Sequence, residues 1–297
     1  MKSGFVSIVG RPNVGKSTLL NKLLNQKIAI TSDKVGTTRN TIYGIYNDED
    51  SQIVFVDTPG INKATSKLGE VLNNKAYSSF DNDLVLFLVD IASGFGPNDN
   101  RILNRLKEDS VPDADVILFL VDGSDPAGKG DKWIAENILK TNIPIIIVMN
   151  KVDKIKKDKL YDEIIKLKDL YNFLDIVPIS SIKGINTTEL IEVIKKYLKD
   201  DVKYFDDDVI TNVSEKFLVG EIIREKILIL TKEEVPHAVT CIVENMEFKK
   251  DKCYINACIV VDRDNLKGII IGKNGQMLKK VGTMAREEIE VLLGKKV

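Results

Sequence analysis

A glycine-rich octapeptide near the start of the chain constrains the fold more than any other feature of the sequence. It reads Gly10-Arg11-Pro12-Asn13-Val14-Gly15-Lys16-Ser17 and matches the pattern G-x-x-x-x-G-K-[ST]. A strand-like run at residues 5–9 precedes it, and four leucines of helical period follow at residues 19–24. A strand, a glycine-rich turn and a helix in this order predict the first unit of a parallel α/β sheet.

The octapeptide also has the chemistry of a phosphate site. Glycines let backbone N–H groups close around phosphate oxygens, and the start of the helix adds positive potential. Lys16 can reach the β and γ oxygens of a nucleotide, and Ser17 can ligate Mg²⁺. We therefore expect nucleotide contacts from all residues of the octapeptide and from Thr18. The alternative, an incidental glycine-rich turn, is disfavoured by the strand and helix on either side.

Two later motifs also follow strand-like runs. In Asp57-Thr58-Pro59-Gly60, the carboxylate of Asp57 suits the Mg²⁺ shell and the N–H of Gly60 suits the γ-phosphate. In Asn150-Lys151-Val152-Asp153, the carboxylate of Asp153 can accept hydrogen bonds from the N1–H and amino group of guanine. Adenine offers no such pair of donors, so GTP is favoured over ATP. Backbone N–H groups at Ser180 and Ser181 follow the next strand and could meet the guanine O6.

These ordered motifs resemble the Era and TrmE branch of the P-loop GTPases. The resemblance implies that Gly36-Thr37-Thr38-Arg39 is the first switch, and that Thr38 meets Mg²⁺ only in the GTP state. It implies catalytic roles for Lys16, Thr38, Asp57 and Gly60. It also implies that Asn13 helps to bind K⁺ in place of an arginine finger, although a mere turn former at Asn13 is an equal alternative. Ile61 stands where Ras-like enzymes carry the glutamine that orients water, so we expect slow intrinsic hydrolysis.

An internal repeat interrupts the family pattern. Residues 83–90 recur almost identically as residues 115–122, and a Gly-x-x-Asp sequence follows each copy at the same offset. This identity predicts local duplication of one strand-helix unit within residues 83–144. A full extra strand would push Asn150 and Asp153 away from the nucleotide, so we expect one copy to be displaced from the sheet.

The pattern of the chain changes after an acidic stretch at residues 206–208, which has the composition of a solvated linker. A helical period at 217–230, strand-like runs at 237–248 and 253–261, and two helices around a glycine-rich turn follow. The turn Gly272-Lys273-Asn274-Gly275 matches the GxxG loop of KH domains. The loop lets an RNA backbone approach, and Lys273, Lys279 and Lys280 offer phosphate contacts. A tight helix-helix turn with solvated lysines is the alternative.

The predicted fold is therefore an α/β P-loop GTPase domain at residues 1–200, a linker at 201–213, and an α+β type II KH domain at 214–297. A KH domain after such a GTPase domain resembles the Era family. The family continues into another strand beyond the last KH helix, whereas this sequence stops at Val297.

Resemblance to the Era family implies a GTP-hydrolysing switch that uses GTP/GDP, Mg²⁺ and K⁺. The implied partners are single-stranded RNA at the 3′ end of the small-subunit ribosomal RNA and the small ribosomal subunit precursor, but not DNA. An RNA-binding assembly protein that binds GTP without turning it over is the alternative function.

Composition limits the remaining classes. Lys and Arg number 43 against 44 Asp and Glu, so any nucleic-acid site must be local. Three cysteines without CxxC spacing argue against disulfides and structural zinc. No signal peptide or membrane-spanning run is visible, which together with the cysteine spacing predicts a cytoplasmic protein. We expect a monomer, and the resemblance to the Era family allows peripheral contact with the cell membrane.

Overall fold

The chain divides into two compact units. The computed structural model describes residues 1–10, 15–34, 36–57, 59, 84–88, 117–122, 145–154, 156, 158, 160–162, 164–165, 175–198, 201–232 and 235–297. Unit 1 comprises residues 1–26 and 38–212, and unit 2 comprises residues 27–37 and 213–297. The predicted division of the chain places residues 27–37 in the N-terminal domain, so their membership of unit 2 is the main difference.

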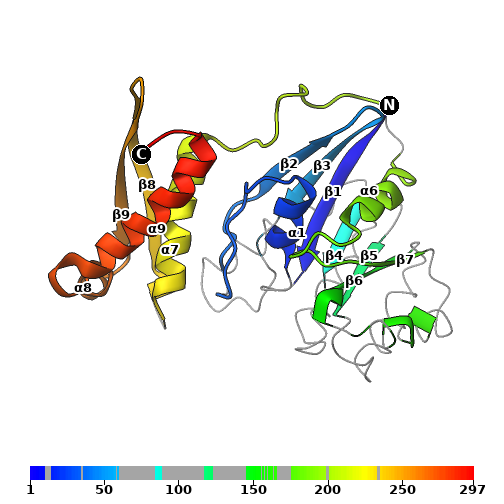
Figure 1. Ribbon diagram of the computed structural model, residues 1–297, viewed down its shortest axis with the longest axis horizontal. Coiled ribbons are helices and arrows are strands. Elements are labelled where there is room, and N and C mark those ends of the chain that lie inside the picture. Colours follow the sequence, from blue (N-terminus) through cyan, green and yellow to red (C-terminus); the bar gives the residue numbers. More distant parts are fainter. Residues whose placement is uncertain are drawn as a thin grey trace. The chain divides into compact units, whose positions relative to one another are not determined.

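Unit 1 is built on a seven-stranded sheet in the order β2-β3-β1-β4-β5-β6-β7 (Figure 1). The strands are β1 Lys2–Gly10, β2 Ile42–Asn47, β3 Ser51–Asp57, β4 Leu84–Leu88, β5 Ile117–Asp122, β6 Ile145–Asn150 and β7 Asp175–Pro178. β2 pairs antiparallel with β3, and all other neighbouring strands are parallel. The predicted α/β class is confirmed.

Two helices of unit 1, α1 (Lys16–Leu23) and α6 (Thr187–Lys195), contact each other. Leu19 and Leu20 of α1 are fully buried, as are Leu190 and Ile194 of α6. All seven residues of β3 are buried, as expected for a central strand covered on both faces. Because β1, β3 and β6 run in the same direction, their carboxyl ends, Gly10, Asp57 and Asn150, lie at one edge of the sheet.

Both copies of the internal repeat contribute a strand to this sheet. β4 comes from the first copy and β5 from the second, and they pair in parallel with Val85 opposite Ile117 and Leu88 opposite Leu120. β5 pairs in turn with β6. The expectation that one copy is displaced is therefore wrong. A parallel strand presents hydrogen-bonding groups along both edges, so two equally apolar copies can extend the same ladder.

The predicted linker is held against the sheet of unit 1 instead of crossing solvent. The side chain of Gln52, which is 1% exposed, accepts hydrogen bonds from the N–H groups of Tyr204 and Phe205 at 2.7 and 2.9 Å. The N–H of Ile45 in β2 donates to the carbonyl of Ile210 at 2.8 Å. The acidic side chains at residues 206–208 remain exposed, as their composition predicts.

Unit 2 packs three helices against a two-stranded antiparallel sheet. Its elements are α7 (Glu215–Leu230), β8 (Val239–Phe248), β9 (Cys253–Val261), α8 (Asp264–Ile271) and α9 (Gln276–Leu293). The two predicted strands form a hairpin, which is closed by a hydrogen bond from the N–H of Lys249 to the carbonyl of Lys252 at 2.8 Å. Two apolar clusters form the core: Ile227, Val235, Val239, Leu266, Ile270 and Val281, and Val219, Ile222, Ala285 and Ile289.

A membrane span is not found in the part of the chain that the structure describes, because none of its helices combines the necessary length and apolar composition.

Candidate functional site: a phosphate and guanine site and a glycine loop

The start of α1 has the backbone geometry of a phosphate loop. Gly15 precedes the helix with φ of 101°, in the left-handed region that favours glycine. Lys16 is 5% exposed, and this burial lowers its pKa to about 8, although the nearby carboxylate of Asp57 acts to raise it. Arg11, Pro12, Asn13 and Val14 lie outside the described residues, so their nucleotide contacts stay predictions.

Three oxygen-bearing side chains meet beside Lys16. The hydroxyl of Ser17 donates to Oδ2 of Asp57 at 2.7 Å and lies 3.0 Å from the hydroxyl of Thr38. Because Ser17 has a single hydroxyl hydrogen, Thr38 must be the donor in the second contact. Asp57 is fully buried at the end of β3. Hydroxyl and carboxylate oxygens are the ligands that Mg²⁺ prefers, so this trio fits the ion.

The motif that follows β3 is described only in part. Asp57 and Pro59 lie in the described structure, whereas Thr58, Gly60 and Ile61 lie outside it. Among the described residues, no group of three or more His, Cys, Asp or Glu side chains could hold a metal ion. The mixed trio of Ser17, Thr38 and Asp57 therefore remains the candidate magnesium site on geometric grounds.

The predicted guanine-binding residues form one hydrogen-bonded cluster. Asn150 ends β6, and its Oδ1 accepts from the N–H and the hydroxyl of Ser181 at 3.0 and 2.9 Å. The hydroxyl of Ser180 donates to Oδ1 of Asp153 at 2.6 Å. That hydrogen bond lowers the pKa of Asp153, which keeps the carboxylate charged and able only to accept. Lys151, between these residues, has φ of 60°, so the chain turns sharply there.

The extra strand does not carry Asn150 away from the phosphate loop. A Cβ atom built on Gly15 would lie 3.4 Å from Nδ2 of Asn150. The amide of Asn150 thus joins the start of α1 to the loop at residues 180–181. The expectation that a strand inserted in the sheet would separate this asparagine from the nucleotide site is wrong.

In unit 2, the predicted GxxG loop joins α8 to α9 at an exposed turn. Gly272 has φ of 70°, and a Cβ atom built there would lie 2.6 Å from Cβ of Met277. Gly275 (φ 74°) and Asn274 (φ 52°) are also left-handed. Only glycine fits at Gly272 without movement, so the loop keeps a bare backbone at its surface.

The surroundings of the loop are both cationic and apolar. Lys273, Lys279 and Lys280 are exposed. Ile269, Ile271 and Leu278 are also 50, 48 and 42% exposed on the helices that flank the loop. The motif predicts the lysines, but it does not predict the exposed apolar surface beside them. The sequence does hold a signal for this surface. A helix that buries Leu266 and Ile270 must leave Ile269 and Ile271 on its other faces.

Three family models match the chain. Residues 5–113 match the 50S ribosome-binding GTPase family, residues 107–200 match the elongation factor Tu GTP binding domain, and residues 234–297 match the KH domain. The first match contains the first copy of the repeat and the second match contains the second copy. Each copy thus stands in the context of a GTP-binding domain.

Solved structures resemble the whole chain. A variant of Era from Aquifex aeolicus bound to GDP and AlF4⁻ is 38% identical, with a TM-score of 0.78. Era in complex with MgGDPNP and nucleotides 1506–1542 of 16S ribosomal RNA is 40% identical, with a TM-score of 0.76. Each similarity covers 100% of this chain and 91% of the other.

Proposed function

Because the chain belongs to the Era family of GTPases, we propose that it is a GTP-dependent switch that binds small-subunit ribosomal RNA and assists assembly of the small ribosomal subunit. One observation carries the proposal: a relative that is 40% identical over the whole of this chain holds both a magnesium nucleotide and nucleotides 1506–1542 of 16S ribosomal RNA. The present chain has a candidate region for each ligand, one in unit 1 and the other in unit 2.

In unit 1, the roles follow from the chemistry of each side chain. Lys16 binds phosphate oxygens, and Ser17, Thr38 and Asp57 hold the magnesium ion. When bound, Mg²⁺ neutralises the charge that develops on the phosphates during transfer. Thr38 joins only in the GTP state, together with Gly60, so loss of the γ-phosphate releases both loops. Asn13 would help to hold K⁺, which would supply positive charge beside the phosphates.

Guanine selectivity comes from Asp153. One carboxylate oxygen is engaged by Ser180, and the charged group still accepts hydrogen bonds from the N1–H and the amino group of guanine. Asn150 and Lys151 frame the base. The N–H of Ser181 turns from Oδ1 of Asn150 to meet the guanine O6, while the N–H of Ser180 stays bonded to the carbonyl of Ile185.

In unit 2, the GxxG loop binds single-stranded RNA. The bare backbone at Gly272 and Gly275 lets the sugar-phosphate chain approach, and Lys273, Lys279 and Lys280 contact phosphates. The exposed Ile269, Ile271 and Leu278 give unstacked bases an apolar surface.

Turnover measurements test the switch. GTP hydrolysis is measured with K⁺ or Na⁺, beside GTP and ATP binding and a Lys16→Ala control. We expect Mg²⁺-dependent turnover of GTP alone, faster in K⁺ and lost in Lys16→Ala. Guanine binding without turnover would favour a passive RNA-binding protein, and absence of guanine binding would contradict the proposed site.

RNA binding is tested separately with an oligonucleotide of the 3′ end of the small-subunit ribosomal RNA. Lys279→Gln removes one phosphate contact and should reduce the slope of log affinity against log salt by about 1. Lys216→Gln, an exposed lysine at the start of α7, is the matched control and should change neither quantity. Equal effects of the two substitutions would mean that the lysines act only through net charge.

A further inference from the structure

The segment immediately before Thr38 is built into unit 2. Residues 27–37 cluster with the C-terminal unit, although Gln26 and Thr38 on either side belong to unit 1. Ile28, Ala29 and Ile30 of this segment are buried, with exposures of 1 to 4%. The chain therefore passes from unit 2 to the proposed magnesium ligand across a single peptide bond.

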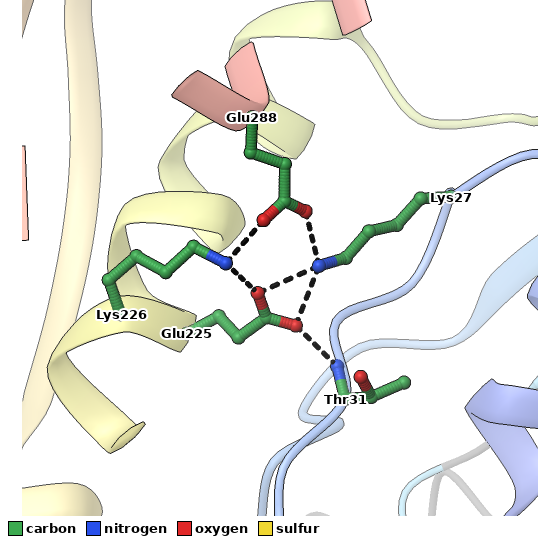
Figure 2. Close-up of polar contacts among 5 residues, drawn as sticks. All are labelled: Lys27, Thr31, Glu225, Lys226 and Glu288. Carbon is green, nitrogen blue, oxygen red and sulfur yellow. Dashed lines mark hydrogen bonds and ion pairs between the residues drawn. The ribbon is translucent and has the colours of Figure 1, made fainter. Parts of the chain in front are cut away.

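Glu225 of α7 anchors the beginning of this segment (Figure 2). Its side chain is 2% exposed and accepts from Nζ of Lys27 with both oxygens, at 2.8 and 2.7 Å. It also accepts from the backbone N–H of Thr31 at 2.8 Å. A carboxylate that gathers a side-chain cation and a backbone donor from the same segment fixes both its position and its local conformation.

The anchor is electrically balanced. Lys226 donates to Glu225 at 2.6 Å and also pairs with Glu288 of α9, which in turn pairs with Lys27. Two carboxylates thus face two ammonium groups. Burial acts to raise the pKa of Glu225, but the bonds from Lys226, Lys27 and Thr31 hold that pKa below its usual value. The carboxylate therefore stays charged at neutral pH, and removal of one cation leaves a buried charge poorly compensated.

Arg224, the preceding residue of α7, anchors the other end of the segment. Its guanidinium is fully buried and donates to both carboxylate oxygens of Glu221, at 2.7 and 2.6 Å. The same guanidinium donates to the backbone carbonyl of Thr37. Between the anchors, the hydroxyl of Thr37 donates to the carbonyl of Lys34 at 2.6 Å, which closes a tight turn.

We propose that Arg224 and Glu225 are positioning residues for GTP hydrolysis, because they hold residues 27–37 in the conformation that delivers Thr38 to the magnesium site, given the role proposed above for Thr38. The two anchors fix both ends of the segment, and the residue that follows has its hydroxyl 3.0 Å from that of Ser17. Because the anchors already order the segment, recruitment of Thr38 by the γ-phosphate and Mg²⁺ does not carry the conformational entropy cost of ordering it. Coupling is reciprocal, so a bound GTP analogue must in turn strengthen the docking of the segment on unit 2.

The test uses the full chain and substitutions at Lys27, because this residue is the side chain by which the segment itself binds Glu225 and Glu288. Lys27→Met removes the cation, and Lys27→Arg keeps it. Lys296→Met is the matched control, since Lys296 also forms an ion pair in unit 2, with Glu290, but does not belong to the segment. The measurements are kcat and KM for GTP, affinity for GDP, and hydrogen exchange of the Thr31 amide.

We expect Lys27→Met to lower kcat by about 5- to 150-fold, the usual range of coupling between sites. GDP affinity should stay within about twofold, because the lost interaction acts only when Thr38 is recruited, whereas KM for GTP should rise for the same reason. The Thr31 amide should exchange faster in Lys27→Met, whereas Lys27→Arg and Lys296→Met should behave like the unaltered chain. In the unaltered chain, a non-hydrolysable GTP analogue with Mg²⁺ should slow exchange at Thr31 relative to GDP.

Faster exchange at Thr31 with unchanged kcat would overturn the proposal, as would equal protection of Thr31 in the GDP and GTP-analogue states. If Lys27→Met leaves Thr31 protected, Glu225→Gln is measured in the same way, and unchanged kcat there is equally decisive against it. Thr38→Ala separates the two levels of inference. Normal turnover in Thr38→Ala would rule out the proposed role of Thr38 as a magnesium ligand. Loss of turnover in Thr38→Ala, with normal turnover in Lys27→Met and Glu225→Gln, would rule out only the anchoring role.

Discussion

Lys16 combines burial with a charge that its ligand requires. The side chain is 5% exposed, and its pKa is lowered to about 8, mainly by burial. Nucleotide phosphates favour the charged ammonium, so the pKa of Lys16 must rise when the nucleotide binds. Binding above pH 8 therefore takes up a proton, and below pH 8 it does not.

The affinity for magnesium GTP should accordingly be flat below pH 7.5 and fall at higher pH. By linkage, a group with a free-state pKa of about 8 costs about tenfold in affinity at pH 9. Titration of the affinity between pH 6.5 and 9 by fluorescence or calorimetry measures this dependence.

Lys16→Arg is the control for the pH dependence, because arginine stays charged over the whole range. Its affinity should be lower but should lack the part of the pH dependence that belongs to Lys16, and any titration of the base or the phosphates remains in both proteins. Parallel curves for lysine and arginine would contradict the assignment of the proton to Lys16.

At the level of elements, the turn between α8 and α9 depends on one glycine. Gly272 is left-handed, and a Cβ atom there would come within 2.6 Å of Cβ and 3.0 Å of the backbone N of Met277. Gly272→Ala should therefore destabilise unit 2 by about 1–3 kcal/mol, through backbone strain and overpacking, and should weaken RNA binding. Chemical denaturation and titration with the RNA oligonucleotide measure the two effects.

Gly268→Ala, in the helix that leads into the turn, gives the matched comparison. Gly268 lies inside α8, and a Cβ atom there would meet no atom within 4 Å. Alanine should stabilise the helix by about 0.5–1 kcal/mol and leave RNA affinity unchanged. Equal destabilisation by both substitutions would show that the turn places no special demand on Gly272.

The helices and strands of unit 2 could be predicted closely from the sequence. The membership of residues 27–37 in this unit could not. Helical period and alternation locate α7, β8 and β9 because each element buries a face against its neighbours in the chain. Residues 27–37 belong to unit 2 through side chains such as Glu225, nearly 200 positions away in the sequence. Local patterns carry no signal for a partner so distant, and a buried carboxylate in an amphipathic helix resembles a solvated one.

In the sheet of unit 1, too, local sequence patterns predict the strands but not their placement. The repeat itself was evident, and the predicted strands after which Asp57 and Asn150 stand are present. The placement of both copies was not predictable from the residues, because each copy is an apolar run that suits a buried parallel strand equally well. The oxygens of Ser17, Thr38 and Asp57 meet regardless, since β1 and β3 pair directly and do not involve the repeat.

At the scale of the whole molecule, the two repeat strands should be interchangeable. The family-model matches at residues 5–113 and 107–200 each contain one copy, so a domain with a single copy satisfies both patterns. Removing residues 83–114 keeps the strand of the second copy, and removing residues 91–122 keeps that of the first. In either chain β6 can pair with the remaining strand, because the same apolar run presents the same hydrogen-bonding edge.

Both deletion proteins should fold and bind GTP with equal affinity, within about the twofold scatter of changes that leave ligand contacts intact. Their GTP turnover should match that of the full chain, because the site residues of α1, β3 and β6 all lie outside the repeat. Thermal unfolding, GTP affinity and turnover of the three chains measure this. If one deletion binds GTP and the other does not, the surviving strand has a specific place beside β1. If both lose GTP binding, the seven-stranded sheet is itself a requirement of the site, and the duplication is part of the working molecule.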